Sequence, residues 1–159
     1  MALDAFIFCN CFETKRLKEK PPVDIDLFVS EYGSIEWNSI DLQTDLILDQ
    51  WVAFRACEHQ NGVLLHHYLG NIALIALLRS ELKIESHKFP ILLEKVLFCG
   101  THCGDFLPFA DVELLKTEVS QLSKHISLTN EDQHFVNEFQ KKMEELIAAS
   151  ISVQKPISF

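Results

Sequence analysis

The sequence predicts an α+β fold in which a small N-terminal antiparallel sheet packs against a mainly helical second half. Two observations predict the sheet: an aromatic, apolar segment at Ala2 to Cys9, and two short apolar segments that flank Tyr32-Gly33-Ser34. A third is the change to apolar spacings of three and four residues from about Asp41 onward, which indicates helices. We expect one domain, because 159 residues, 48% of them hydrophobic, are enough to bury one core.

The N-terminal segments each have a simple interpretation. Ala2 to Cys9 is short and apolar, which predicts a buried first strand. Lys15 to Lys20 is a basic loop that runs into two prolines. Leu27 to Ser30 and Ile35 to Trp37 are spaced as a hairpin, in which Gly33 supplies a positive φ at the turn.

Helices are expected along the rest of the chain. The apolar spacing from Asp41 predicts an amphipathic helix that stops near Asn61-Gly62. Leu65 to Leu82 is apolar on most sides and predicts a central helix, where Gly70 permits a close helix crossing. Phe89 to Phe98 reads as a short helix or as a buried strand.

Two further helices complete the predicted fold. Val112 to Ile126 carries apolar residues at helical spacing. Thr129 and Asp132 resemble a capping box ahead of a last apolar series that begins at Phe135.

Charge and hydropathy exclude several classes of protein. Lys and Arg number 14 against 23 Asp and Glu, for a net charge of −9, so nucleic acid is an unexpected partner. The start of the chain lacks the cationic residues of a signal peptide, and Val63 to Leu78 is interrupted by polar groups that a bilayer disfavours. Five cysteines, an odd number, fit a reducing compartment. We therefore expect a soluble cytoplasmic protein with no membrane partner.

The residues that can carry chemistry gather in three places. These are Cys9 with Cys11; Cys57, Glu58 and His59 with His66 and His67; and Cys99, His102, Cys103 and Asp105. We expect the second and third groups to line any functional pocket, because each lies at the end of a predicted element.

We first expect that these residues bind no metal, and that the thiols are buried and the histidines hydrogen-bonded. The alternative is a zinc site formed by His59, His66, His102 and Cys103, because thiolate and imidazole are ligands that zinc prefers. Cys103 as a nucleophile is a further hypothesis, with an imidazole from another segment as its base. The sequence contains no complete catalytic signature, so catalytic residues stay unknown and enzyme activity is the less favoured prediction.

Three segments carry a resemblance: Ala56 to Gly62, Leu65 to Asn71 and Gly100 to Asp105. With the Cys-x-Cys turn near the start of the chain, they resemble a set of small uncharacterised bacterial proteins, a likeness that assigns no catalytic role to any residue. In size and acidity the chain is also similar to immunity proteins of bacterial toxin systems.

These observations predict an acidic protein that acts by protein–protein interaction. Its sharpest version is a toxin-neutralising immunity protein, with a basic toxin domain as the partner. The alternatives are a zinc-binding protein or metal-dependent enzyme that uses the Cys and His residues, and a domain that binds a small ligand.

Overall fold

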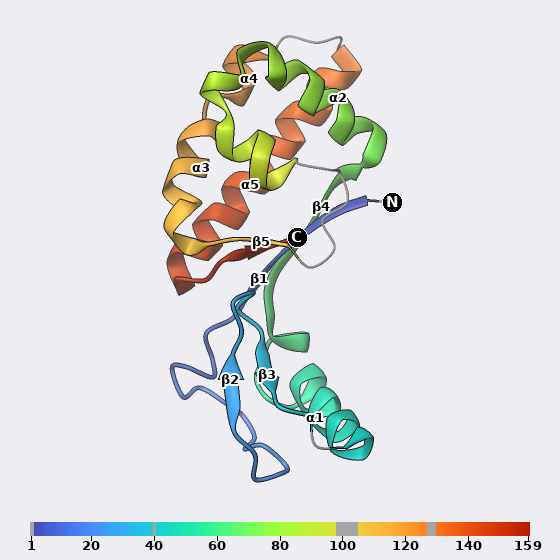
Figure 1. Cartoon of the computed structure of the whole chain (residues 1–159), viewed down its shortest axis with the longest axis vertical. Coiled ribbons are helices and arrows are strands. Elements are labelled where there is room, and N and C mark those ends of the chain that lie inside the picture. Colours follow the sequence, from blue (N-terminus) through green and yellow to red (C-terminus); the bar gives the residue numbers. More distant parts are fainter. Residues whose placement is uncertain (1, 40, 98–104, 127–129) are drawn as a thin grey trace.

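The computed structural model describes residues 2–39, 41–97, 105–126 and 130–159. The molecule is elongated (Figure 1): most of the helices occupy one end, a hairpin and the first helix occupy the other, and two long strands run between them. The predicted α+β class is confirmed, with an antiparallel sheet packed against helices of the second half.

The strands are β1 (Ala2–Phe8), β2 (Leu27–Val29), β3 (Ile35–Trp37), β4 (Val63–Asn71), β5 (Phe106–Leu107) and β6 (Ile157–Ser158). They form a four-stranded sheet in the order β4-β1-β6-β5 and a separate two-stranded sheet of β2 and β3. All of the strand pairs are antiparallel. The hairpin is therefore not part of the main sheet.

The α-helices are α1 (Leu42–Phe54), α2 (Ile72–Leu82), α3 (Val112–Val119), α4 (Leu122–His125) and α5 (Asn130–Val153). Four shorter helical segments accompany them: η1 (Gln60–Gly62), η2 (Lys83–Lys88), η3 (Leu92–Val96) and η4 (Phe109–Asp111). Among the described residues, none of the helices is both long and apolar enough to span a bilayer.

The first strand confirms its prediction. Leu3, Ala5 and Ile7 alternate along β1 and are each at most 1% exposed, as expected for a strand with one face against a core. That core continues into α2, α3 and α5. A second, smaller core lies at the other end of the molecule, where Leu48 and Trp51 of α1 pack against the hairpin.

The hairpin and α1 also form where the sequence predicts them. Gly33 has a φ of 93° at the hairpin turn, a backbone conformation that residues other than glycine rarely adopt. The Asp41 side chain caps α1 by accepting a hydrogen bond of 2.9 Å from the backbone N–H of Thr44. The helix ends earlier than expected, at Phe54, and positive φ angles at Asn61 and Gly62 belong to the turn that leads into β4.

The predicted central helix at Leu65 to Leu82 is wrong in its first half. Residues up to Asn71 form β4, which pairs with the whole length of β1, and α2 begins only where Asn71 supplies a side-chain cap. Nor is α2 buried on all sides, because Ile72 is 43% exposed. Gly70 does mark a close approach, but of a strand to a helix: a Cβ there would lie 2.9 Å from the ring of Phe135 in α5.

The remaining helical predictions hold in outline. η3 gives the helical alternative for Phe89 to Phe98, whose last residue lies outside the described residues. Val112 to Ile126 is divided into α3 and α4 rather than continuous. Thr129 also lies outside the described residues, so the capping box remains a prediction.

A buried carboxylate joins α3 to the start of η3. Glu118 is 6% exposed, and its two oxygens accept hydrogen bonds of 2.9 and 2.8 Å from the backbone N–H groups of Ile91 and Leu92. These N–H groups belong to the first turn of a helical segment. The backbone N–H groups of a first turn have no hydrogen-bond acceptor within their own helix. Burial raises the pKa of Glu118, and the two hydrogen bonds act in the opposite direction.

We expect Glu118→Gln to lower the free energy of unfolding by about 1 to 3 kcal/mol, because an amide has one acceptor oxygen and leaves one buried N–H without a partner. Glu113→Gln on the same helix is the control, since Glu113 is exposed and should change stability by less than about 0.5 kcal/mol. Chemical denaturation of both variants measures the difference. Equal stabilities would show that Glu118 does not stabilise the segment.

Candidate metal centre

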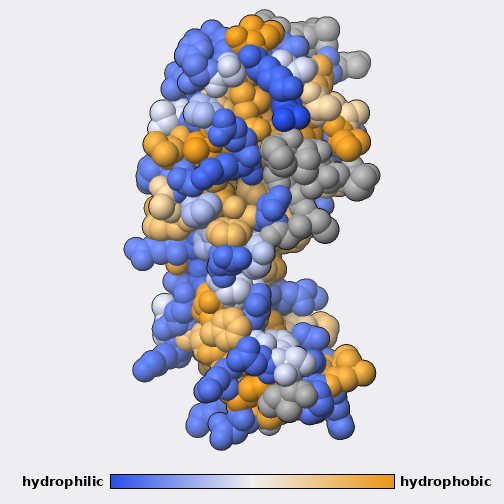
Figure 2. Space-filling view, viewed as in Figure 1, coloured by the Kyte–Doolittle hydropathy of each residue, from blue (hydrophilic) through white to orange (hydrophobic). Residues whose placement is uncertain are grey.

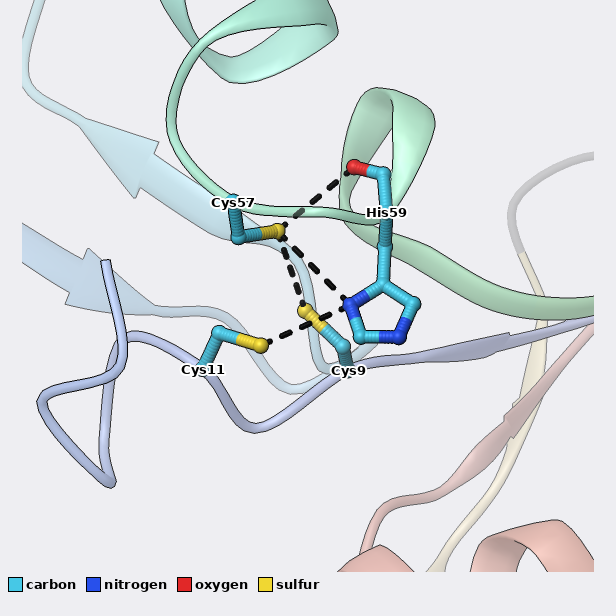
Figure 3. A group of neighbouring side chains, drawn as sticks. All are labelled: Cys9, Cys11, Cys57 and His59. Carbon is cyan, nitrogen blue, oxygen red and sulfur yellow. Dashed lines mark hydrogen bonds between the residues drawn. The ribbon is translucent and has the colours of Figure 1, made fainter. Parts of the chain in front are cut away.

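Three cysteines and one histidine converge between the main core and the smaller core. The Sγ atoms of Cys9, Cys11 and Cys57 and a ring nitrogen of His59 all lie within 4.8 Å of one another. Figure 3 shows the four side chains pointing toward one point from two segments of the chain. We refer to these four residues as the Cys₃His cluster.

The first pair of residues is positioned by the end of β1. Cys9 directly follows the strand, and its backbone N–H donates a hydrogen bond of 2.8 Å to the carbonyl of Gly62 beside β4. The chain then turns, and the N–H of Arg16 returns to the carbonyl of Cys11 at 2.7 Å. Cys9 and Cys11 therefore lie in a turn whose backbone is tied at both ends.

The second pair follows the end of α1. The helix stops at Phe54, and the chain continues through Ala56, whose carbonyl accepts a hydrogen bond of 2.8 Å from the N–H of Lys18. His59 has extended backbone angles (φ −93°, ψ 119°). Residues 56–59 form a series of bends, which brings the Cys57 Sγ within 3.8 Å of His59 Nδ1.

Three of the distances within the Cys₃His cluster match those of a tetrahedral zinc site. Cys9 Sγ lies 3.7 Å from Cys57 Sγ, and His59 Nδ1 lies 3.5 Å from Cys11 Sγ and 3.8 Å from Cys57 Sγ. Around a zinc ion with Zn–S bonds of about 2.3 Å and a Zn–N bond of about 2.0 Å, tetrahedral angles place two sulfurs about 3.8 Å apart and sulfur and nitrogen about 3.5 Å apart. The four donor atoms, all within 4.8 Å of one another, are therefore close enough to bind one ion together.

The cluster is largely removed from solvent. Cys9, Cys11 and Cys57 are 8%, 5% and 6% exposed, and Leu64 packs against them. Burial raises the pKa of the Cys9 thiol to about 12, and burial also raises the pKa of the Cys11 thiol. A divalent cation among them would supply the positive charge that allows buried thiols to ionise.

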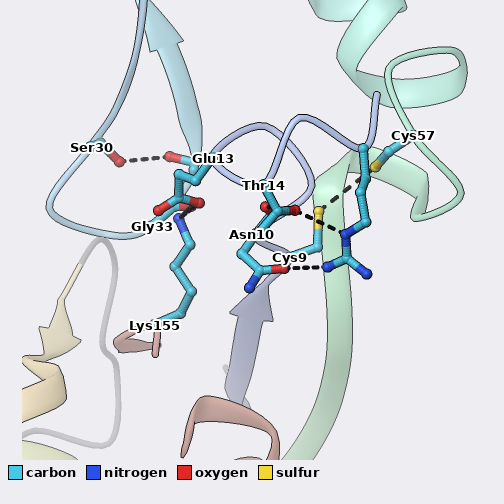
Figure 4. Close-up of polar contacts among 10 residues, drawn as sticks. Cys9, Asn10, Glu13, Thr14, Ser30, Gly33, Cys57 and Lys155 are labelled. Atoms are coloured by element: carbon cyan, nitrogen blue, oxygen red, sulfur yellow. Dashed lines mark hydrogen bonds and ion pairs between the residues drawn. The ribbon is translucent and has the colours of Figure 1, made fainter. Parts of the chain in front are cut away.

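Polar contacts outside the Cys₃His cluster hold the cysteine turn in place (Figure 4). Asn10 and Thr14 accept side-chain hydrogen bonds of 2.7 and 2.9 Å from Arg16. On the other side of the turn, Glu13 forms an ion pair of 2.6 Å with Lys155, whose side chain is only 4% exposed. Lys155 also donates to the carbonyl of Gly33, so one ammonium group connects the cysteine turn to the hairpin.

Of the pocket residues predicted from the sequence, the structure brings Cys57 and His59 together. Their neighbour Glu58 is exposed, and it approaches Lys18 at 3.7 Å instead of the cluster. Asp105 is an exposed residue that begins the segment leading into β5. Cys99, His102 and Cys103 lie outside the described residues, so their part in a pocket remains a prediction.

His66 and His67 have other partners. They are consecutive residues of β4 and therefore point to opposite faces of the sheet. His66 stacks on Phe6 and lies 2.9 Å from a carboxylate oxygen of Asp4, whereas His67 lies 2.7 Å from a carboxylate oxygen of Glu145. Neither belongs to the Cys₃His cluster, so of the two predicted zinc ligands that the structure describes, His59 is in the cluster and His66 is not.

Cys9 and Cys11 are the cluster residues absent from the predicted pocket. The signal that points to them is the pairing of two similar motifs, Cys9-x-Cys11 and Cys57-x-His59. Two pairs of closely spaced ligands from separate segments are the usual composition of a structural zinc site.

The comparisons with known proteins add no relative to this geometry: no protein family, no curated protein and no solved structure matches the chain.

Proposed function

We propose that this protein binds one zinc ion through Cys9, Cys11, Cys57 and His59, and that the ion has a structural role. The observation that carries the proposal is the convergence of the four donor atoms within 4.8 Å of one another, with three of their distances close to those of a zinc tetrahedron. Three thiolates and one imidazole are a common ligand set of structural zinc sites.

The chemistry of the donors favours zinc over other common cations. Magnesium and calcium prefer oxygen ligands and higher coordination numbers, and the Cys₃His cluster offers sulfur and nitrogen. Structural zinc sites are almost always tetrahedral with four ligands, and the d electrons of zinc impose no other geometry.

A structural role is favoured because the ligand set is complete. A catalytic zinc ion usually keeps a position open for water or substrate, whereas all four positions are supplied here by the protein. The ligands are also far apart in the sequence: Cys9 and Cys57 are separated by 48 positions, as are Cys11 and His59. The ion would therefore cross-link the end of β1, which lies in the main core, to the end of α1, which lies in the smaller core.

A metal-dependent enzyme is accordingly the less supported version of the zinc hypothesis. Neutralisation of a basic toxin domain, expected from the acidity of the chain, stays a prediction.

We expect the protein purified without chelator to contain about one zinc ion per chain. Cys11→Ser and Cys57→Ser should each reduce the zinc content, because each removes one thiolate ligand. His66→Ala is the matched control and should retain full zinc content, since His66 lies outside the Cys₃His cluster. Elemental analysis measures the content. A full zinc content in both cysteine variants would refute the proposed ligands.

Replacement of zinc by Co²⁺ gives a second measurement that does not depend on yield. We expect the visible absorption bands of tetrahedral Co²⁺ with thiolate ligands in the wild type and in His66→Ala. The spectrum of an octahedral, oxygen-bound ion would contradict the proposed geometry.

We expect chelation of the metal to loosen one end of the molecule more than the other. Hydrogen exchange should become faster in residues 9–18 and 55–62, while the amides of α3 and α5 keep their protection, because their core does not contain the cluster. Stability should fall by about 3 kcal/mol relative to protein in which free zinc is about 100-fold above Kd. Equally faster hydrogen exchange throughout the chain, or unchanged exchange, would show that the ion does not cross-link these two segments.

A further inference from the structure

A second feature lies at the end of the molecule that carries the hairpin. A hollow of about 380 Å³ opens between β3 and the C-terminal half of α1. Its lining residues are Ile35, Trp37, Asp49, Gln50, Val52, Ala53, Phe54 and Asn61. Most of these side chains are apolar, and Asp49 is the charged one among them.

The hollow continues into an apolar row on the outer surface of α1. Leu42, Leu46 and Phe54 are 76%, 52% and 71% exposed. Because they are spaced by multiples of four, they lie in one row along the helix. Figure 2 shows apolar surface at this end of the molecule among hydrophilic residues. Large apolar side chains exposed next to a hollow are typical of a surface that a partner covers.

Negative charge is concentrated in the same part of the chain. Residues 21–54 contain seven Asp and Glu residues and neither Lys nor Arg. This segment therefore carries −7 of the net charge of −9, and all other residues together carry −2. Aspartates adjoin this apolar row, because Asp45 follows Leu42 and Asp49 follows Leu46 by three positions, a spacing that makes helical residues neighbours, and Asp41 caps the start of α1.

The aspartates differ in what they already bind. Asp41 caps α1, and Asp45 accepts a hydrogen bond of 2.9 Å from the indole N–H of Trp37. Asp49 is exposed at the hollow, and within the described part of the chain it forms no ion pair. The same holds for Asp24 and Asp26 before β2, so several carboxylates remain for charges of a partner.

We propose that this hollow and the adjoining face of α1 are a docking surface for a basic segment of another protein. An aliphatic or aromatic side chain of the segment enters the hollow beside Trp37 and Phe54, and flanking Lys or Arg residues approach Asp49 and its neighbours. The argument is charge complementarity: an apolar hollow surrounded by carboxylates favours a cationic partner and disfavours an anionic one.

Other occupants fit less well. Nucleic acid and anionic lipid would be repelled by the seven acidic residues. A second copy of the chain would bring a like-charged face to the same surface. Part of the basic stretch of the chain already has partners in its own molecule, because Leu17 packs on the smaller core and Lys18 lies 3.7 Å from Glu58.

The test uses the full-length chain and a synthetic peptide of alternating Lys and Leu residues, with a Glu and Leu peptide as its counterpart. Fluorescence reports binding, since Trp37 lines the hollow and the second tryptophan, Trp51, is fully buried. We expect the Lys peptide to bind, with an affinity that falls as salt is added, and the Glu peptide not to bind. Phe54→Ser and Asp49→Asn should each weaken binding by about tenfold.

Leu114→Ser and Glu113→Gln are the matched controls, because they change an exposed apolar and an exposed acidic residue of α3. Both should leave binding of the Lys peptide unchanged, and circular dichroism confirms that each variant is folded. Equal weakening in the controls, or a Kd above about 1 mM for the wild type, would overturn the proposal. A dimer of the wild type that Phe54→Ser dissociates would assign the surface to a second copy and would also overturn it.

Discussion

The antiparallel pairing of β1 with β4 is the constraint on which the rest of the structure depends. It runs from Ala2 opposite Asn71 to Phe8 opposite Val63, and Figure 1 shows these two strands connecting the ends of the molecule. One face of β1 supplies side chains to the main core. Where the pair ends, the residues after β1 meet those before β4, which brings the Cys9 turn beside the His59 segment. The same ladder therefore organises the core and positions the Cys₃His cluster.

Much of the fold could be predicted from local patterns. The first strand, the hairpin and α1 each have a pattern that belongs to one element type, and the structure confirms them. The stretch from Leu65 to Leu82 could not be resolved in this way, because its length favours one helix, whereas the structure divides it into a strand and a shorter helix. The conformation of the first part of this stretch depends on β1, since β4 obtains its hydrogen bonds from that strand, about 60 residues away in sequence. Periodicity within the run contains no information on that partner.

Two of the four residues of the candidate site could be predicted from the sequence, and the other two depend on a distant segment. Cys57 and His59 were expected in a pocket, but as part of a helical segment two residues apart they would point in different directions. The structure ends α1 at Phe54, and the bends that follow bring the two side chains within 3.8 Å of each other. Their partners Cys9 and Cys11 come from a segment 48 positions earlier. Residue type and spacing identify two possible ligand pairs, and only the pairing of β1 with β4 shows that they meet.

The position of β6 in the main sheet affects how the protein folds during its synthesis. β6 lies between β1 and β5, with Ser158 opposite Phe6 in the first strand. A ribosome releases β1 long before residues 157–158, so β1 can pair with β4 but not with β6 while most of the helices are being made. Until then, the edge of β1 around Phe6 lacks the strand that pairs with it in the finished fold, and an unpaired strand edge attracts other strands. Sequence separation this large also slows folding, because the ends of a long loop must find each other. The part of the β1 edge around Phe6 therefore stays without its strand partner in the nascent chain until β6 adds to the sheet.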